Sequence, residues 1–232
     1  MNNKQEIKKV GVPHGYPPEE GCYLRGNDYS PVVVIVILKY RREETPPSIE
    51  QLVRVGIENG AALSGTLQTE NVGLEKVICN VIANPNIRYS VICGPESPGH
   101  LVGDAINALY KNGIDENKRI IGTQAPAPYL FNIPKEWVDR FIKQTKLVDL
   151  VNEGSVDVIR EVVWSCYQEK PTKFREYELW DYGAYTEEPI CGKITWKITN
   201  PAYAPKDKDE QEALEKMQDL INKLKARSKN KG

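Results

Sequence analysis

The chain of 232 residues has almost no net charge and lacks the long apolar runs of membrane proteins. Its 31 Lys and Arg residues are balanced by 32 Asp and Glu residues, and a formal charge of -1 gives no overall field to attract nucleic acid or an anionic membrane. No apolar run approaches the roughly 18 residues that a membrane helix needs, and the polar start MNNKQEIKKV lacks the apolar core of a signal peptide. These absences predict a soluble, cytoplasmic protein that binds no nucleic acid and has no membrane span.

Paired cysteines and phosphate-binding loops are also absent. The five cysteines are scattered and form no CxxC pair, so we expect reduced thiols rather than a zinc or redox site. Neither GxGxxG nor GxxxxGK[ST] occurs, which disfavours an enzyme that uses a nucleotide. Only two histidines occur, and we expect His14, in a Pro-Gly loop, to lie at the surface.

Apolar runs alternate with amphipathic stretches along the chain, and hydrophobic residues make up 40% of it, enough for a sizeable core. The run VVVIVIL at 32–38 is β-branched and unbroken, which is typical of a central strand covered on both faces. This alternation predicts an α/β fold with a Rossmann-like, doubly wound, mostly parallel sheet. Further strands are expected at 61–64, 87–93, 119–121 and 147–151, and helices at 45–58, 69–83, 100–111, 134–146 and 155–168.

The pattern changes beyond Pro171. The segments FREYELWD at 174–181 and ICGKITWKI at 190–198 predict two alternating strands, and 206–229 predicts a charged helix with one apolar stripe. We therefore expect a Rossmann-like domain at 1–170 and an appendage at 171–232, composed of a β-hairpin and that helix.

Three loops leave the carboxyl ends of the expected strands, where open α/β sheets bind ligands. They are rich in Gly, Pro, Thr, Asn and Gln and carry no Lys or Arg, which suits a large ligand with many amides better than a polyphosphate. The candidate binding residues are Thr66, Gln68, Thr69, Glu70 and Asn71 in the first loop, Gly94, Pro95, Glu96, Pro98, Gly99, His100 and Leu101 in the second, and Thr123, Gln124, Ala125, Pro126, Ala127 and Pro128 in the third.

His100 has several possible roles at this stage. It could open a helix, pair with Cys93 for catalysis, or bind a metal. One histidine cannot hold a free ion, but it suffices where a macrocycle supplies the other bonds, as in haem and corrinoids. Glu70 and Asn71 fit a helix start and a ligand contact equally well, and Glu96 fits solvent or ligand.

The stretch from Thr69 to His100, TENVGLEKVICNVIANPNIRYSVICGPESPGH, is followed by LVGDAINALYKNGIDENKRIIG and PYLFNIP. Its elements TEN-x-G-x-EK, NPNIR, GH-xx-G and NGID stand in that order, and the similarity extends from about Tyr16 to Val151. In these features the chain closely resembles the A subunit of tetrahydromethanopterin S-methyltransferase, which carries the corrinoid in an enzyme of methane-forming metabolism.

The resemblance implies that the three loops bind cobalamin (a cobamide) and that His100 is the lower axial ligand of its cobalt. It also implies methyl transfer shared with partner methyltransferase subunits, from methyl-tetrahydromethanopterin to cobalt and then to the thiol of coenzyme M. The segment from His100 to Gly103 matches the HxxG half of the DxHxxG signature of other cobalamin proteins, but Pro98 stands where the aspartate would be. The group that orients the imidazole is therefore not identified by the sequence.

The A subunit of this enzyme ends in a membrane-spanning helix, whereas this chain ends in ALEKMQDLINKLKARSKNKG, which is too charged to span a bilayer. Two interpretations follow: a soluble paralogue that serves another methyltransferase, or a chain cut before its anchor. The rival to the carrier hypothesis is a Rossmann-like regulatory or scaffold subunit that binds no corrinoid.

Overall fold

The computed structural model describes residues 8–39 and 44–194, together with Glu212 and Glu215. Its main sheet has five strands in the order β1-β3-β2-β4-β5. The four strands from β2 to β5 run parallel, and β1, which the sequence did not predict, pairs antiparallel to β3 at one edge. The expected α/β fold with a mostly parallel sheet is confirmed. The strands are β1 (Tyr23–Arg25), β2 (Val32–Ile37), β3 (Leu63–Leu67), β4 (Tyr89–Gly94) and β5 (Lys146–Val151).

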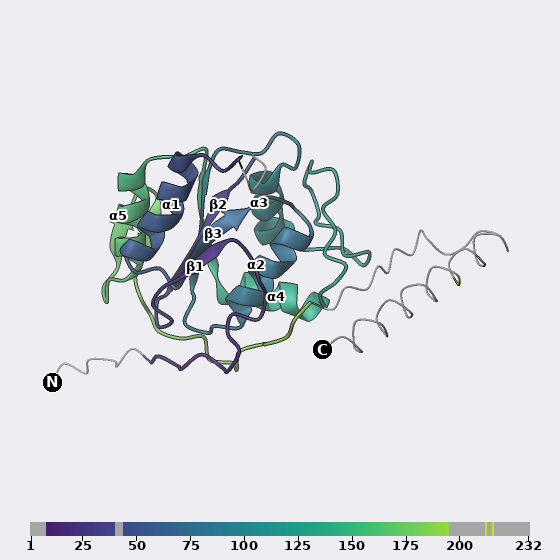
Figure 1. The fold of residues 1–232 in the computed structure, drawn as a ribbon. Helices are drawn as coiled ribbons and strands as arrows, with labels where there is room; N and C mark the ends of the chain where they lie inside the picture. Colours follow the sequence, from purple (N-terminus) through teal and green to yellow (C-terminus); the bar gives the residue numbers. More distant parts are fainter. Residues whose placement is uncertain (1–7, 40–43, 195–211, 213–214, 216–232) are drawn as a thin grey trace, which may run out of the picture. The chain divides into compact units, whose positions relative to one another are not determined.

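Helices cover both faces of this sheet (Figure 1). One face carries α1 and α5, and the other carries α2, α3 and α4, so the sheet is doubly wound. Within the described residues, none of these helices has the length and apolarity that a bilayer span requires. The helices are α1 (Pro47–Glu58), α2 (Val72–Ile82), α3 (Val102–Asn112), α4 (Lys135–Gln144) and α5 (Val156–Cys166).

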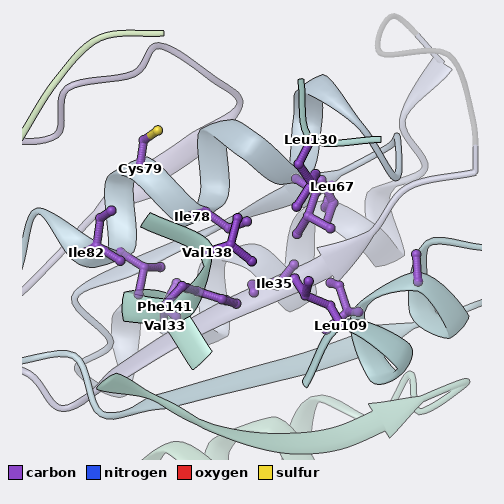
Figure 2. Packing of buried hydrophobic residues seen from close by; sticks show 14 of the residues in the cluster. Val33, Ile35, Leu67, Ile78, Cys79, Ile82, Leu109, Leu130, Val138 and Phe141 are labelled. Carbon is purple, nitrogen blue, oxygen red and sulfur yellow. The ribbon is translucent and has the colours of Figure 1, made fainter. Parts of the chain in front are cut away.

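The central strand β2 explains how an unbroken apolar run forms a strand. All six of its side chains are buried, and they alternate between two hydrophobic clusters. Val33, Ile35 and Ile37 pack towards α2, α3 and α4, and Figure 2 shows Val33 and Ile35 in this cluster with Phe141 of α4. The alternate valines of β2 pack towards α1 and α5. Each of these side chains contributes roughly 1.5–3 kcal/mol of burial free energy.

The strand order places a ligand crevice at a known position. From β2 the chain crosses to β3 on one side, and then returns over β2 to β4 on the other side. In doubly wound sheets of this order, ligands bind at the carboxyl ends where the direction reverses, which here lies between β2 and β4. The second loop, which contains His100, leaves β4 at this point.

Several element boundaries differ from the expectations. The strand expected at 119–121 was wrong, because Arg119 and Ile120 form only isolated bridges, to Tyr129 and Ile114. The helices expected from residues 69 and 100 begin at Val72 and Val102, because the residues before them form turns. These turns hold residues of the candidate site outside the helices.

The C-terminal strands also differ from the expectations. The single strand expected at 174–181 was wrong: β6 (Thr172–Phe174) and β7 (Tyr177–Leu179) form a hairpin, and Arg175 at the turn has a φ of 52°. Residues 190–194 form no strand, while 195–198 lie outside the described residues. The helix expected at 206–229 also lies outside them, apart from Glu212 and Glu215.

The hairpin belongs to the packed body, because Phe174 and Leu179 are buried in the cluster on the α1 and α5 face. Contacts between Cα atoms divide the chain into Met1–Trp196 and Lys197–Gly232. The predicted boundary between a binding domain at 1–170 and an appendage at 171–232 stays a prediction.

Candidate functional site

One buried carboxylate joins the three candidate binding loops, of which the first two leave β3 and β4 and the third lies between α3 and α4. Glu70, in the first loop, is 0% exposed. Its Oε2 lies 2.7 Å from Nδ1 of His100 in the second loop, and its Oε1 accepts a hydrogen bond of 2.9 Å from the backbone N–H of Ala127 in the third. The three candidate binding loops therefore meet at Glu70.

His100 is held by Glu70 in a defined orientation. The side chain of His100 is 46% exposed, whereas that of its partner is fully buried. A carboxylate accepts but cannot donate, so in a neutral imidazole the bond places the proton on Nδ1 and leaves the lone pair on Nε2. Histidines that bind metals are oriented in this way, with one ring nitrogen held by a carboxylate and the other free for the metal.

This bond supplies the orienting group that the sequence left unidentified. The carboxylate comes from thirty residues upstream of His100 instead of the position two residues before it, where Pro98 stands. Glu70 was expected to start a helix or contact a ligand. The structure places both of its oxygens on neighbouring loops, and its contact with a ligand stays a prediction.

The backbone beside His100 is strained. Leu101 has φ 47° and ψ 50°, the left-handed conformation that costs a residue with a Cβ about 1–2 kcal/mol. Its N–H and that of His100 both donate to the carbonyl of Ser97, at 2.7 and 3.1 Å, which closes a turn before α3 begins. The side chain of Leu101 packs against the core and offsets this cost. Strain of this kind collects at functional sites.

Glu96 caps the helix that follows the turn. Its Oε1 accepts from the backbone N–H of Gly103 at 3.0 Å, and its Oε2 accepts from that of Asp104 at 2.9 Å. A carboxylate at this position satisfies free N–H groups and interacts favourably with the helix dipole. The structure thus gives Glu96 a structural role, and its contact with a ligand stays a prediction.

The third loop is tied to the same helix through Asp104, a residue that the sequence analysis missed. Its Oδ2 accepts from the hydroxyl of Thr123 and from the backbone N–H of Gln124, the latter at 2.8 Å. The hydroxyl of Thr123 in turn accepts from the N–H of Ala125 at 3.1 Å. The sequence feature that could have identified Asp104 is its position in the first turn of a predicted helix, with a Gly-Thr loop after that helix.

The other candidate residues divide by exposure and partners. Asn71 caps α2 by accepting from the N–H of Val72 at 2.8 Å, and Thr69 accepts from that of Gly73 at 3.1 Å. Gly94, with φ 86°, is buried and turns the chain away from β4. Exposed at the crevice are Gln68, Pro98, Gly99, Gln124, Pro126 and Ala127; half-buried are Thr66 and Pro95; buried are Ala125 and Pro128.

A catalytic pair of Cys93 and His100 is disfavoured. Cys93 is 0% exposed in β4, and burial raises the pKa of its thiol to about 12. The thiolate is the nucleophilic form, and it is negligible at neutral pH for such a group.

Residues 8–195 match the sequence profile of the family described as the A subunit of tetrahydromethanopterin S-methyltransferase. The chain belongs to this family. The A subunit numbered 2 of Methanothermobacter thermautotrophicus is 38% identical over 189 residues, which cover 81% of this chain and 91% of the relative. The A subunit numbered 1 of the same organism is 38% identical over 171 residues, or 73% and 67% of the two chains. The A subunit of Methanopyrus kandleri is 39% identical over 185 residues, or 79% and 67%.

Membership in this family of tetrahydromethanopterin S-methyltransferase A subunits confirms the resemblance seen in the sequence and identifies the chain as part of a methyltransferase. The matched range extends beyond the segment at 16–151 that carried the resemblance, and it includes the hairpin of β6 and β7. Glu70, His100, Asp104 and Ala127 all lie inside it. The site described above is therefore part of the shared family region.

Proposed function

We propose that this chain carries a corrinoid and takes part in methyl transfer within a methyltransferase of several subunits. Nε2 of His100 would be the protein's ligand to the cobalt of that corrinoid. The observation that carries it is the bond between Glu70 and His100 at the carboxyl ends of parallel strands, in a chain of this family.

The residues present fit a corrinoid. Among the residues that the structure describes, no group of three or more His, Cys, Asp or Glu side chains could hold a metal ion. His100 therefore offers a single bond, and a corrin ring brings the remaining equatorial ligands itself. The ring's edge carries many amide groups, which match the exposed amides of Gln68 and Gln124.

The chain's own residues orient and support the ligand. Glu70 fixes the tautomer and direction of the imidazole, and it also holds the third loop through Ala127. Asp104 ties that loop to α3, so all three loops are fixed to one another. When bound, the corrinoid would supply the cobalt that takes a methyl group from a methylated pterin and passes it to a thiol.

Partner subunits bring the methyl-pterin donor and the thiol acceptor in this proposal. The relatives are named as subunits of tetrahydromethanopterin S-methyltransferase, which supports a shared catalytic assembly. The substrate named in those relatives, tetrahydromethanopterin, defines the class of donor.

The test uses Co(II) cobalamin and electron paramagnetic resonance. We expect hyperfine splitting from a protein nitrogen in the wild type, its loss in His100→Ala, and its retention in the matched variant His14→Ala, which alters the other histidine. Glu70→Gln should keep the nitrogen signal but bind cobalamin about 10- to 100-fold more weakly, the usual cost of losing the group that orients a ligand.

Identical spectra for the wild type and His100→Ala would remove His100 from the coordination of cobalt. A folded wild-type chain that binds no cobalamin would contradict the carrier proposal and favour a regulatory or scaffold subunit.

A further inference from the structure

A further loop leaves the carboxyl end of the sheet beside the loop that carries His100. It comprises residues 152–155 and joins β5 to α5, and the sequence analysis did not include it among the candidate binding loops. Strands β4 and β5 are parallel neighbours, so the loops that follow them start side by side. Asn152, the first residue of this loop, is exposed and has a φ of 69°, a left-handed conformation in which Asn is enriched among residues with a Cβ.

Backbone hydrogen bonds join the two loops at their first residues. The N–H of Gly94 donates to the carbonyl of Glu153 at 2.7 Å, and the N–H of Asn152 donates to the carbonyl of Gly94 at 2.8 Å. These bonds continue the pairing of β4 and β5 past the ends of both strands. The start of the loop that carries His100 is therefore fixed to residues 152–153.

The side chain of Asn152 adds a bond further along the neighbouring loop. Its Oδ1 accepts from the backbone N–H of Glu96 at 3.0 Å. Glu96 is thereby held on both sides, because its carboxylate accepts from the N–H groups of Gly103 and Asp104 in α3. The Oε1 of Glu96 also accepts from the N–H of Ser97 at 2.7 Å, so the position of Glu96 determines that of the next residue.

Ser97 connects these bonds to the backbone of His100. Ser97 is 3% exposed, and its carbonyl accepts from the N–H groups of His100 and of the strained residue that follows it. Backbone strain of this kind persists only where the surrounding contacts maintain it. A continuous path of hydrogen bonds thus runs from Asn152 through Glu96 and Ser97 to the backbone of His100, whereas Glu70 holds the ring.

We propose that Asn152 is a positioning residue for His100. This inference rests on the proposed function, and it adds a group that sets the place of the imidazole rather than its direction. With the amide of Asn152 in place, the loop is fixed where Nε2 of His100 reaches the cobalt. Without it, the loop samples other positions, and the apparent affinity for cobalamin falls with the fraction of molecules in which His100 is in place.

The loop that contains Asn152 is itself held by the hairpin of β6 and β7. The guanidinium of Arg175, at the hairpin turn, lies 2.7 Å from Oε2 of Glu153, and Oε1 of Glu153 accepts from the N–H of Ser155 at 3.0 Å. Both interactions hold the pKa of the Glu153 carboxyl below its usual value, so it stays charged at neutral pH. The hairpin, which lies in the range matched by the family, therefore supports the loop next to the site.

The test removes the side chain of Asn152 while the backbone keeps its conformation. Glycine adopts a positive φ without strain, so Asn152→Gly loses only the amide. Asn152→Asp keeps an Oδ1 acceptor for the N–H of Glu96 but removes the amide donor. The matched control is Asn27→Gly in the loop before β2, because Asn27 is also exposed and its Oδ1 also accepts from a backbone N–H, that of Tyr29, at 3.0 Å.

Cobalamin affinity is followed by visible absorption in about 1 M salt, which screens the charge that aspartate adds. We expect Asn152→Gly to lower the affinity by about 2- to 10-fold, the usual contribution of one hydrogen bond. Asn152→Asp should recover most of this loss, and Asn27→Gly should keep the wild-type affinity.

A double-mutant cycle with His100→Ala separates positioning from other roles of Asn152. If Asn152 acts through His100, Asn152→Gly lowers the affinity of the wild type but not that of His100→Ala. An equal loss in both backgrounds, or an aspartate variant as weak as the glycine variant, would overturn the positioning role and leave the carrier function standing. A wild-type chain that binds no cobalamin would instead contradict the carrier function.

A second measurement needs no corrinoid and therefore holds even if His100→Ala binds too weakly for the cycle. Hydrogen exchange at the backbone amides of His100 and Leu101 should become faster in Asn152→Gly, measured on the unloaded chain. It should stay at the wild-type rate in Asn152→Asp and in Asn27→Gly. Unchanged exchange at both amides in Asn152→Gly would mean that Asn152 does not hold the turn, and it would overturn the proposal.

Discussion

Two buried polar side chains lie at opposite ends of the sheet, and they differ in what their partners can do. Gln144, the last residue of α4, is 1% exposed and lies near the amino end of β4. Its Nε2 donates to the carbonyls of Val81, Asn84 and Ile87 at 2.9–3.2 Å, and its Oε1 accepts from Nε of Arg140 at 3.0 Å. Each of these partners is itself buried.

Glu70 is buried as completely as Gln144, but its partners face the crevice. His100 is half-exposed, and Ala127 lies on an exposed loop. Burial of a polar group does not by itself indicate function, because Gln144 only completes the hydrogen bonds of the interior. The feature that indicates function is a buried polar group whose hydrogen-bond partner is exposed to solvent and has a second nitrogen that can bind a ligand.

The amino end of the sheet is also closed by a segment of the chain. The guanidinium of Arg88 lies 4.4 Å from the ring centre of Tyr182, and that of Arg140 lies 4.3 Å from that of Tyr185. These cation–π contacts fasten the extended segment after β7 across this end. The two ends are thus specialised, one for closure and one for access.

The largest expected effect comes from Gln144→Met, which keeps the volume but removes the amide. Three buried carbonyls and one guanidinium N–H lose a partner, so we expect the free energy of unfolding in urea to fall by about 3 kcal/mol or more. Cobalamin affinity of the folded variant should match the wild type. Gln168→Met is the matched control, because its amide makes an exposed bond to the carbonyl of Trp164, and it should change stability by less than about 0.5 kcal/mol. A loss below that value in Gln144→Met would contradict the closure role.

A smaller loss of stability is expected from Glu70→Ala, about 1–2 kcal/mol. The reason is that the ring of His100 and the N–H of Ala127 can turn to water once the carboxylate is gone. Hydrogen exchange of the Ala127 amide should become faster in this variant, and His100→Ala should leave it protected. If Glu70→Ala and Gln144→Met cost the same free energy, the proposed difference between the two ends fails.

The periodic features of the fold were accessible from the sequence. The unbroken apolar run at 32–38 predicted β2, because successive side chains of a strand point to opposite faces. A strand buried on both faces therefore needs apolar residues at every position. The strand predicted at 119–121 was wrong because the segment is too short. Three apolar or charged residues do not show whether a segment forms a strand of a sheet or only isolated bridges. Strand β1 is equally short and was missed.

Only part of the candidate site could be predicted from the sequence. His100 could be located because a lone histidine followed a predicted strand, and parallel strands end at one edge. Its bond to Glu70 could not, because it joins two turns thirty residues apart and depends on side-chain directions rather than on a period. Glu70 and Glu96 look alike in the sequence, yet one orients His100 and the other caps α3.

The smallest expected effect concerns Glu75, a third buried polar group, which lies between the two ends on α2. Burial raises the pKa of its carboxyl above the usual value, while hydrogen bonds from the side chain and backbone of Asn132 act to lower it. A raised folded-state pKa means that the folded protein binds more protons than the unfolded chain between the two pKa values. The contribution to stability is therefore complete below the unfolded value, near 4.5, and it declines as the pH rises through the folded value.

Glu75→Gln should remove this decline, and Asn132→Ala should steepen it, because it removes a bond that favours the charged form. The measurement is the free energy of unfolding in urea from about pH 4 to about pH 7, where we expect the wild type to lose stability relative to Glu75→Gln as the pH rises. A slope of the opposite sign would mean that the bonds to Asn132 outweigh burial. Glu75 would then resemble Glu70 in holding a neighbouring segment through its carboxyl oxygens, and the contrast between the two ends of the sheet would extend along α2.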